Sequence, residues 1–376
     1  MNCVYDIRGT NGSGKSTLVR EILRRWKNVF IQNEEIPYHY VYGLNLCILG
    51  GYAGKGSGVD NVKGSDRLQR FMWDKLEEGH NVLLEGVIVS HIFGRWNEMA
   101  HNVKAEGYDY KFYYMDVPVE VAIERVKDRR EAAGKDREYD PKNTIRFQEA
   151  TLRVVNKLEE EGHEVTRLSD LELDEEYDWL MSDILDDLFK QWQDPYYKLD
   201  HGVLDLRGNH GSGKTTYMKR LCKEATKIED ELISYRLKDG IAYLPNFSKK
   251  IKNMDIDVRY AAAFLHSILE RYSVVLEGVN NGADINDVLI TLTGHTKGYI
   301  IMLLNESKEE CFRRKNIVWM HKYKTPYDRF KIVQYEKNLN KTMEKYMKTK
   351  ATMLVEVESY KERTENRIFT IVKNFS

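Results

Sequence analysis

The chain has 376 residues, which predicts about two domains at roughly 150 residues per domain. Its composition, 42% hydrophobic and 31% charged, is typical of a globular protein and argues against both disorder and membrane spans. Asp6 and Arg8 stand where a signal peptide would be apolar. Four cysteines lie far apart without a Cys-x-x-Cys pair, which argues against a disulfide framework and a zinc site. We therefore expect a reduced, cytoplasmic protein.

The net charge of −1 conceals opposite charges on the two halves. Residues 1–200 carry 27 Lys+Arg and 37 Asp+Glu, a net of −10, and residues 201–376 carry the remaining 31 and 22, a net of +9. Near-neutrality argues against a generally basic nucleic-acid binder. The asymmetry indicates two domains with different surfaces, of which the second can meet a polyanion.

The two halves of the chain repeat one another. Residues 4–17 and 203–216 are identical at nine of fourteen positions. Two further pairs of apolar segments recur in the same order, and the second pair is followed in each half by a basic helix: 82–87 with 274–279, and 113–116 with 301–304. Three matches in one order indicate two copies of one α/β unit.

In each copy, apolar runs of strand length alternate with helical stretches, the pattern of a parallel sheet wrapped by helices. In the first copy we predict strands at 3–8, 29–32, 81–85, 111–116 and 164–168. The acidic stretch 170–192 spaces large apolar residues helically, which predicts a terminal helix packed on its own domain. A hinge at Asp194-Pro195-Tyr196-Tyr197 then separates domains at 1–193 and 194–376.

Both repeated segments match the phosphate-loop pattern Gly-x-x-x-x-Gly-Lys-[Ser/Thr], directly after an apolar strand and before an amphipathic helix. The glycines let successive N–H groups turn toward phosphate oxygens, and the helix N-terminus adds its dipole. In this pattern the lysine contacts the β- and γ-phosphates of ATP, and the residue after it, Ser16 or Thr215, binds Mg²⁺. The predicted nucleotide-binding residues are Gly9, Thr10, Asn11, Gly12, Ser13, Gly14, Lys15, Ser16 and Thr17, with Gly208, Gly211, Ser212, Gly213, Lys214, Thr215 and Thr216.

Asp6 and Arg8 lie two residues apart on the first predicted strand and so share a face. Asp205 and Arg207 occupy the same positions in the second copy. Each pair can form an ion bridge beneath its phosphate loop. Alternatively, Asp6 orders Mg²⁺-bound water or the attacking group, and both interpretations stay open.

Two glutamates, Glu85 and Glu277, end apolar strands, where ligands of open α/β sheets collect. A carboxylate there can hold the water shell of Mg²⁺ or orient an accepting hydroxyl. Glu34 and Glu35 follow the short second strand. They are either solvated loop charges or a base that faces the acceptor.

Arg125 and Arg129 are four residues apart on a predicted helix and therefore share a face. They can clamp the phosphoryl group in transfer, or belong to a charged surface helix. The second copy keeps Arg313, Arg314 and Lys315 but continues with Asn316-Ile317-Val318-Trp319, so any lid there differs.

Two segments are peculiar to one copy. The glycine-rich stretch 49–60 lies between the second and third predicted strands, where it either admits an acceptor or is merely flexible, and it has no counterpart in the second copy. From 313 to 331, basic residues alternate with Trp319, Tyr323 and other aromatics. That pattern fits a single-strand binding surface or an amphipathic helix with a solvated face.

Three features resemble the P-loop nucleoside and nucleotide kinase superfamily, with thymidylate kinase as a familiar relative: Gly9–Ser16, the Leu-Glu-Gly strand end at Glu85, and Asp116-Val117-Pro118 followed by Arg125, Arg129 and Arg130. The resemblance covers 1–170 and, more weakly, 201–376. Thymidylate kinases carry Asp-Arg-Tyr/His where this chain has Glu85-Gly86-Val87, which argues against free thymidylate as the substrate. Segment 6–17 more closely resembles the bacteriophage 5-hydroxymethyluracil DNA kinases.

The resemblance implies two tandem P-loop kinase-like domains, each a parallel sheet flanked by helices. It implies ATP- and Mg²⁺-dependent phosphorylation of the hydroxymethyl group of 5-hydroxymethyluracil in phage DNA, a step towards hypermodified thymidine that resists host restriction. Lys15, Mg²⁺ on Ser16, Arg125 and Arg129 would stabilise the transferring group, and Glu85 or Asp6 would position the hydroxyl. A base inside a duplex must be flipped out or already unpaired.

Two other functions remain open: a tandem deoxynucleoside monophosphate kinase acting on free nucleotides, and a nucleotide-driven ATPase or ATP-gated binding protein. They differ in where the phosphate of ATP goes, which is to DNA, to a mononucleotide or to water. The second domain can bind DNA, regulate through ATP or add a second phosphate.

Overall fold

The computed structural model describes residues 2–32, 34–52, 58–134, 139–169, 172–191, 199, 201–229, 234–247, 250–251, 258–277, 296, 299–346 and 352–358. The chain divides into two compact units, Met1–Gln191 (unit 1) and Trp192–Ser376 (unit 2). The predicted hinge at 194–197 lies outside the described residues. Within the described part of the chain, no helix has the length and apolar character of a membrane span.

Unit 1 is built on a seven-stranded sheet. Its strands are β1 (Cys3–Arg8), β2 (Asn28–Ile31), β3 (Tyr38–Val41), β4 (Leu46–Leu49), β5 (Asn81–Glu85), β6 (Asp109–Asp116) and β7 (Val165–Ser169), in the spatial order β2-β3-β4-β5-β1-β6-β7. The pairs from β4 to β7 are parallel, whereas β2–β3 and β3–β4 are antiparallel. All six residues of the central strand β1 are buried, as expected of a strand covered on both faces.

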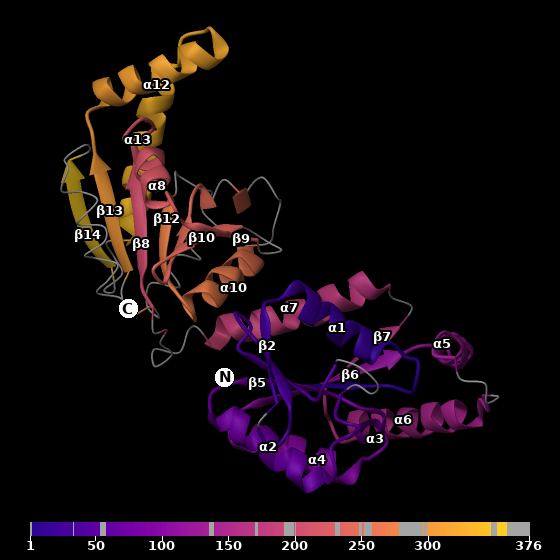
Figure 1. Cartoon of the computed structure of the whole chain (residues 1–376). Helices are drawn as coiled ribbons and strands as arrows, with labels where there is room; N and C mark the ends of the chain where they lie inside the picture. Colours follow the sequence, from indigo (N-terminus) through magenta and orange to yellow (C-terminus); the bar gives the residue numbers. More distant parts are fainter. Residues whose placement is uncertain are drawn as a thin grey trace. The chain divides into compact units, whose positions relative to one another are not determined.

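Helices cover both faces of this sheet (Figure 1). They are α1 (Lys15–Arg25), α2 (Ser65–Glu77), α3 (Val87–Ser90), α4 (Gly94–Ala105), α5 (Val119–Ala132), α6 (Lys142–Glu160) and α7 (Leu173–Gln191). On one face α2, α4 and α6 bury an apolar cluster with β1, β5 and β6. On the other face α1 and α7 lie side by side.

Helix α7 confirms the helix predicted over 170–192 and its packing on its own domain. Its apolar residues recur at helical spacing and are buried: Tyr177, Leu180, Met181, Ile184, Leu185 and Leu188. Asp187 reaches the sheet, where its Oδ2 accepts a hydrogen bond from Tyr5 (2.9 Å) and pairs with Lys111 Nζ (2.8 Å). Trp179, which belongs to the same apolar pattern, is instead 57% exposed.

The five predicted strands of the first copy are confirmed to within a few residues, but the prediction was incomplete. The hairpin of β3 and β4 lies between the predicted second and third strands. Each of its strands has only four residues, too few for a clear alternating pattern. Its turn contains Gly43 and Asn45, both at positive φ. The glycine-rich stretch therefore follows β4 rather than β2.

Unit 2 repeats the fold. Its strands are β8 (Val203–Gly208), β9 (Thr226–Ile228), β10 (Tyr235–Lys238), β11 (Ile241–Leu244), β12 (Ser273–Glu277), β13 (Tyr299–Asn305) and β14 (Thr352–Glu358). Read from its antiparallel edge, the order is β9-β10-β11-β12-β8-β13-β14, which is the order of unit 1. Its helices include α8 (Lys214–Leu221), α10 (Val258–Leu269), α12 (Lys308–Tyr323) and α13 (Arg329–Tyr346). The internal duplication is confirmed at the level of topology.

Candidate active site

The phosphate loop of unit 1 joins the end of β1 to the start of α1. Gly12 has φ +81°, and a Cβ there would lie 2.3 Å from the carbonyl oxygen of Ala122, so the position requires glycine. Lys15 is buried, and its Nζ donates to the carbonyl oxygens of Gly9 (2.8 Å) and Thr10 (2.9 Å). Burial lowers the pKa of Lys15. The lysine side chain thus folds back over the phosphate loop, where the phosphates of a nucleotide would bind.

Glu85 lies beside this loop because β5 runs parallel to β1 and the two strands end together. Ser16 Oγ donates a hydrogen bond to Glu85 Oε1 (2.8 Å). Burial raises the pKa of Glu85, although Lys15 opposes the shift. Sequence reasoning assigned Ser16 and Glu85 separately to Mg²⁺, and the structure brings the two together.

The pair of Ser16 and Glu85 fits a magnesium ion. Mg²⁺ takes oxygen ligands and is usually held by one or two protein groups, with phosphate and water completing the shell. Among the described residues, no group of three His, Cys, Asp or Glu side chains forms a metal site by itself. An ion at Ser16 and Glu85 would therefore bind together with a nucleotide.

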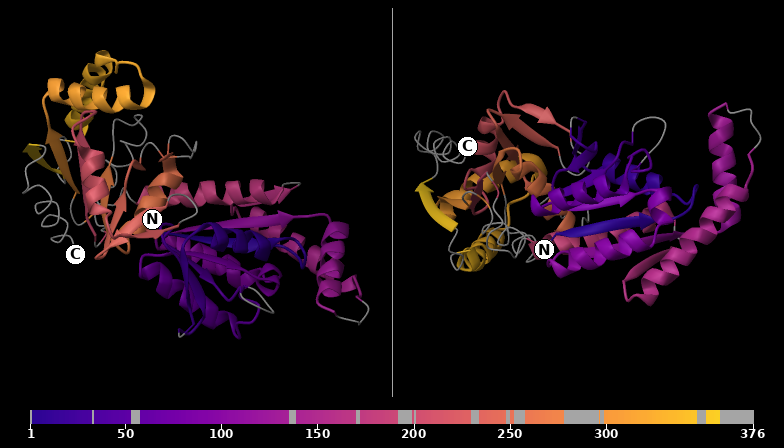
Figure 2. Two further views of the ribbon diagram at one scale, coloured as in Figure 1. Left: turned by 45° about the horizontal axis from the view of Figure 1, so that its top comes forward. Right: turned by 90° about the horizontal axis from the view of Figure 1, so that it is seen from below.

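A cleft of about 1310 Å³ opens over the phosphate loop and Glu85. Its other wall is formed by α5 and α6, which stand together at one side of unit 1 (Figure 2). Arg125 and Arg129, the predicted clamp, both line this cleft. Three further arginines line it too: Arg20, Arg130 and Arg146. Arg130 belongs to the sequence pattern that resembles the kinases, whereas Arg20 and Arg146 were not predicted from the sequence. The cleft is therefore strongly cationic where a triphosphate would lie.

The end of the glycine-rich stretch packs directly on Glu85. Val59 N donates to the carbonyl oxygen of Glu85 (3.0 Å), and a Cβ on Gly58 would lie 2.6 Å from Glu85 Oε1. Asp60 accepts hydrogen bonds from the N–H groups of Val87 (3.0 Å) and Ile88 (2.9 Å), and it lines the cleft. Residues 53–57, in the middle of the predicted acceptor loop 49–60, lie outside the described residues.

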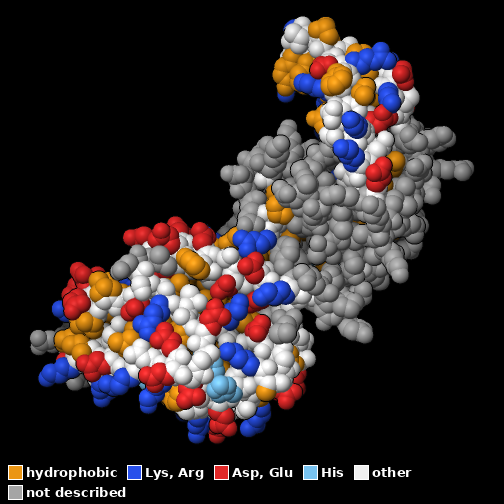
Figure 3. Space-filling model, turned by 180° about the vertical axis from the view of Figure 1, so that it is seen from behind, with side chains coloured by type: hydrophobic (Ala, Val, Ile, Leu, Met, Phe, Trp, Pro, Cys, Tyr) orange, Lys and Arg blue, Asp and Glu red, His pale blue; other side chains and the backbone are white. Residues whose placement is uncertain are grey.

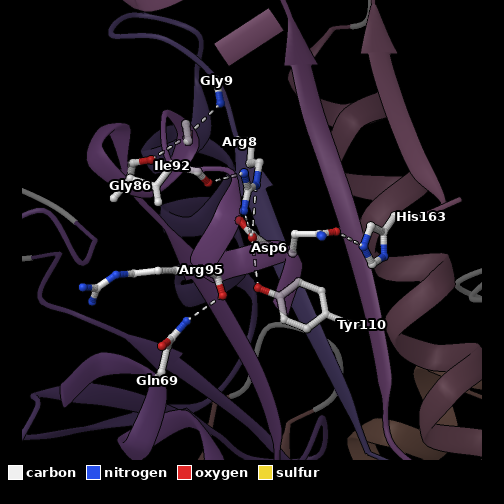
Figure 4. A network of polar contacts seen from close by, with 11 residues as sticks. Asp6, Arg8, Gly9, Gln69, Gly86, Ile92, Arg95, Tyr110 and His163 are labelled. Carbon is white, nitrogen blue, oxygen red and sulfur yellow. Dashed lines mark hydrogen bonds and ion pairs between the residues drawn. The ribbon is translucent and has the colours of Figure 1, made fainter. Parts of the chain in front are cut away.

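The structure corrects the catalytic assignment of Asp6. Its carboxylate is 0% exposed and does not line the cleft. Oδ2 accepts hydrogen bonds from Arg8 Nη2 (2.7 Å) and Tyr110 Oη (3.0 Å), within the network that Figure 4 shows. The ion pair beneath the loop is thus present, and Asp6 is not placed to touch a transferring phosphoryl group.

Unit 2 contains the same buried arrangement. Asp205 Oδ2 accepts hydrogen bonds from Arg207 Nε (2.8 Å) and Tyr299 Oη (2.9 Å). Neither Tyr110 nor Tyr299 was singled out from the sequence, because each lies roughly 100 residues beyond its aspartate. Their equivalent places on β6 and β13 could have been found only by aligning the two copies.

Glu34 and Glu35 do not reach the active site. Glu34 pairs with Lys75 (3.0 Å), and Glu35 pairs with Arg67 (2.9 Å). Neither glutamate lines the cleft over the phosphate loop. The interpretation of these residues as loop charges is correct.

The phosphate loop, the hydroxyl–carboxylate pair and the arginine-lined cleft of unit 1 together form the active site of a P-loop phosphotransferase of the kinase class. The family described as 5-hmdU DNA kinase matches residues 2–153. The chain is 32% identical over 167 residues to the 5-hmdU DNA kinase of Pseudomonas phage PaMx11, and this alignment covers 42% of the chain and 86% of the relative. It is 33% identical over 137 residues to the 5-hmdU DNA kinase of Pseudomonas phage M6, an alignment that covers 33% of the chain and 70% of that relative. The chain belongs to the 5-hmdU DNA kinase family.

Among solved structures, a gluconokinase from Sinorhizobium meliloti 1021 matches 47% of this chain and 97% of its own, with 12% sequence identity and a TM-score of 0.27. The fold assignment rests on the strand order of the two sheets and not on this similarity.

Proposed function

We propose that unit 1 transfers the γ-phosphoryl group of ATP to the hydroxymethyl oxygen of 5-hydroxymethyluracil in DNA. The observation that carries the proposal is the single cleft that combines the phosphate loop, Glu85 and the arginines of α5 and α6. The acceptor comes from the names of the phage relatives. The phosphorylated base would be an intermediate, formed in the host cytoplasm, on the way to hypermodified thymidine, which resists host restriction.

In the proposed reaction, the hydroxyl oxygen attacks the γ-phosphorus in line and the bond to the β–γ bridging oxygen breaks, which releases ADP. Lys15 neutralises the phosphate chain, while Arg125 and Arg129 face the equatorial oxygens on which charge spreads. The hydroxyl proton passes to a carboxylate. Glu85 is the candidate, since it lies in the cleft and burial raises its pKa.

Ser16 would hold Mg²⁺, and Glu85, which accepts a hydrogen bond from Ser16 Oγ (2.8 Å), would hold the ion or a water on it. When bound, the ion would neutralise charge on the β- and γ-phosphate oxygens.

A base inside a duplex is out of reach of such a cleft, so the substrate base must be flipped out or unpaired. Two aromatic side chains offer it a surface, because Phe147 and Tyr139 both line the cleft. Phe147 is supported from behind by His91, whose ring stacks on it at 4.5 Å and 21°. Burial lowers the pKa of His91 to about 4, so this support is uncharged at neutral pH.

The test supplies γ-labelled ATP and Mg²⁺ together with three acceptors: DNA that contains 5-hydroxymethyluracil, ordinary DNA and free deoxynucleoside monophosphates. Digestion of the DNA to nucleosides then locates the label. We expect label on the modified base, its loss in Lys15→Ala, and its retention in Lys127→Ala, an exposed lysine of α5 outside the cleft. Label in free diphosphates would instead indicate a nucleotide kinase, and release of free phosphate alone would indicate an ATPase.

A further inference from the structure

The two units can be compared residue by residue along α5 of unit 1 and α12 of unit 2, the helices that follow β6 and β13 and that we call the lids. Tyr110 of β6 pairs with Val4, and Tyr299 of β13 pairs with Val203, the equivalent residue of the second copy. The two segments therefore differ by 189 in residue number. An independent contact agrees, because a Cβ on Gly12 would meet the carbonyl oxygen of Ala122, and one on Gly211 would meet that of Cys311, each at 2.3 Å.

The following helices, α6 and α13, correspond with a difference of 188. Thr10 Oγ1 donates to the carbonyl oxygen of Thr144 (3.2 Å). Asn209, which occupies the position of Thr10 in the phosphate loop of unit 2, donates from Nδ2 to the carbonyl oxygen of Ile332 (3.1 Å). Just before each helix stands a Tyr-Asp pair, at 139–140 and at 327–328. Each aspartate accepts a hydrogen bond from the backbone N–H two residues later.

Unit 2 keeps what is needed to hold a nucleotide. Lys214 Nζ donates to the carbonyl oxygens of Gly208 (2.6 Å) and Asn209 (2.9 Å), as Lys15 does in unit 1. Thr215 Oγ1 donates to Glu277 Oε1 at 2.7 Å, which repeats the pair of hydroxyl and carboxylate that fits Mg²⁺. The phosphate cradle and its ion-binding oxygens are therefore preserved.

The arginines that face the transferring group in unit 1 are not preserved. Val318 stands at the position of Arg129, and Trp319 at that of Arg130. Arg314 corresponds to Arg125 but is held by two glutamates, Glu306 (2.9 Å) and Glu310 (2.6 Å). Valines occupy both glutamate positions in unit 1, at 117 and 121. The lid of unit 2 therefore presents no unengaged guanidinium at these three positions.

In place of the arginines, unit 2 has a pocket of about 390 Å³ lined mainly by lysines and aromatic rings, among them His210, Lys315, Trp319, Lys322, Tyr323 and Tyr335. His210 belongs to the phosphate loop and stacks on Tyr335 at 3.9 Å and 12°. Figure 3 shows basic, acidic and hydrophobic side chains intermixed over α12 and α13, where Val318 and Tyr323 are exposed. Lysines suit phosphates, and ring faces suit a base.

We propose that unit 2 binds a nucleoside triphosphate with Mg²⁺ and does not transfer its phosphoryl group. The phosphate loop and the lysines of the pocket hold the phosphates, and the aromatic rings receive the base. Transfer is lost because a positioned arginine contributes about 10³- to 10⁵-fold to phosphoryl transfer, and a lysine cannot replace its two-pronged contact. This inference does not depend on which acceptor unit 1 uses.

The test counts bound nucleotides by equilibrium dialysis with a labelled ATP analogue that has an imido β–γ bridge, in the presence of Mg²⁺. We expect two nucleotides per wild-type chain, one in Lys15→Ala, one in Lys214→Ala and none in the double variant. Lys127→Ala is the matched control and should bind two. One nucleotide in the wild type and none in Lys15→Ala would overturn the proposal.

Two further measurements guard against misfolding and against another ligand. When Trp319→Ala is added to the Lys15→Ala chain, it should weaken binding of the analogue at least 10-fold while the circular dichroism spectrum is unchanged. If Trp319→Ala instead weakens only the binding of a single-stranded oligonucleotide, the pocket is a DNA site and the proposal is wrong. The Lys15→Ala chain should transfer no label to any acceptor, and transfer within 10-fold of the wild-type rate would also refute it.

Discussion

Replacing Gly58 by alanine should damage catalysis far more than folding. A Cβ at residue 58 would lie 2.6 Å from Glu85 Oε1 and 2.3 Å from the Glu85 carbonyl oxygen. Real Cβ contacts essentially never fall under 3.0 Å, so Glu85 and residue 58 must move apart, by at least 0.4 Å at Oε1 and 0.7 Å at the carbonyl oxygen. Misplacement by about 1 Å can cost about 10²-fold in rate, so we expect a loss of about 10- to 100-fold in kcat.

Gly79→Ala is the matched control for the backbone. Gly58 has φ +67° and Gly79 has φ +89°, so alanine is strained at both, by about 1–2 kcal/mol. Nothing lies within 4 Å of a Cβ on residue 79, so that variant carries the strain without the clash. Both variants should lose stability, and Gly58→Ala should lose more.

The assay compares kcat for phosphoryl transfer and the urea unfolding midpoint of both variants with the wild type. Equal kcat in Gly58→Ala and Gly79→Ala would show that the position of Glu85 does not govern the rate. A large loss of kcat in both would trace the effect to general destabilisation. Only a selective loss in Gly58→Ala supports the placement of Glu85 at the reacting centre.

Three other predictions test separate parts of unit 1. Arg129→Ala should lower kcat by about 10²-fold or more, whereas Lys127→Ala on the same helix should not change it, as steady-state kinetics would show. Arg8→Met should destabilise unit 1 by about 3–5 kcal/mol in urea unfolding by leaving the Asp6 carboxylate buried and uncompensated, and adding Asp6→Leu should restore part of the loss. Burial raises the pKa of Glu176 to about 7, so between pH 4.5 and 7 the folded state holds a proton on Glu176 that the unfolded state has lost, and the wild type should lose stability relative to Glu176→Gln as the pH rises through this range. In urea unfolding, Glu176→Gln should be more stable than the wild type at pH 8, by at most about 3 kcal/mol, and equally stable near pH 4.5.

The parts of the site that the sequence predicted are those encoded in short contiguous segments. The phosphate loop, the Leu-Glu-Gly strand end and the Arg125/Arg129 face each have a local pattern with a physical meaning. The repeat strengthened them, because the same segments recur in order. The parallel order of the central strands then follows, since each strand is separated from the next by a helix.

The remainder of the site depends on contacts between distant segments. Arg20 and Arg146 line the cleft only because α1 and α6 border the same space, and neither has a sequence pattern of its own. Asp60 was visible as the end of a glycine-rich stretch, but its bonds to the start of α3 were not. Asp6 was misassigned because its position beside the loop is evident from sequence, whereas its burial against Tyr110 is not.

Comparison of the two units separates framework from chemistry. The buried arrangement of aspartate, arginine and tyrosine is present in both, although one lid carries arginines and the other carries lysines and aromatic rings. Each aspartate is buried in an ion pair with the arginine two residues later, beneath its phosphate loop. We therefore infer that Asp6 and Asp205 support the loop in both units, whereas the units differ in α5 and α12, the helices that follow the strands β6 and β13.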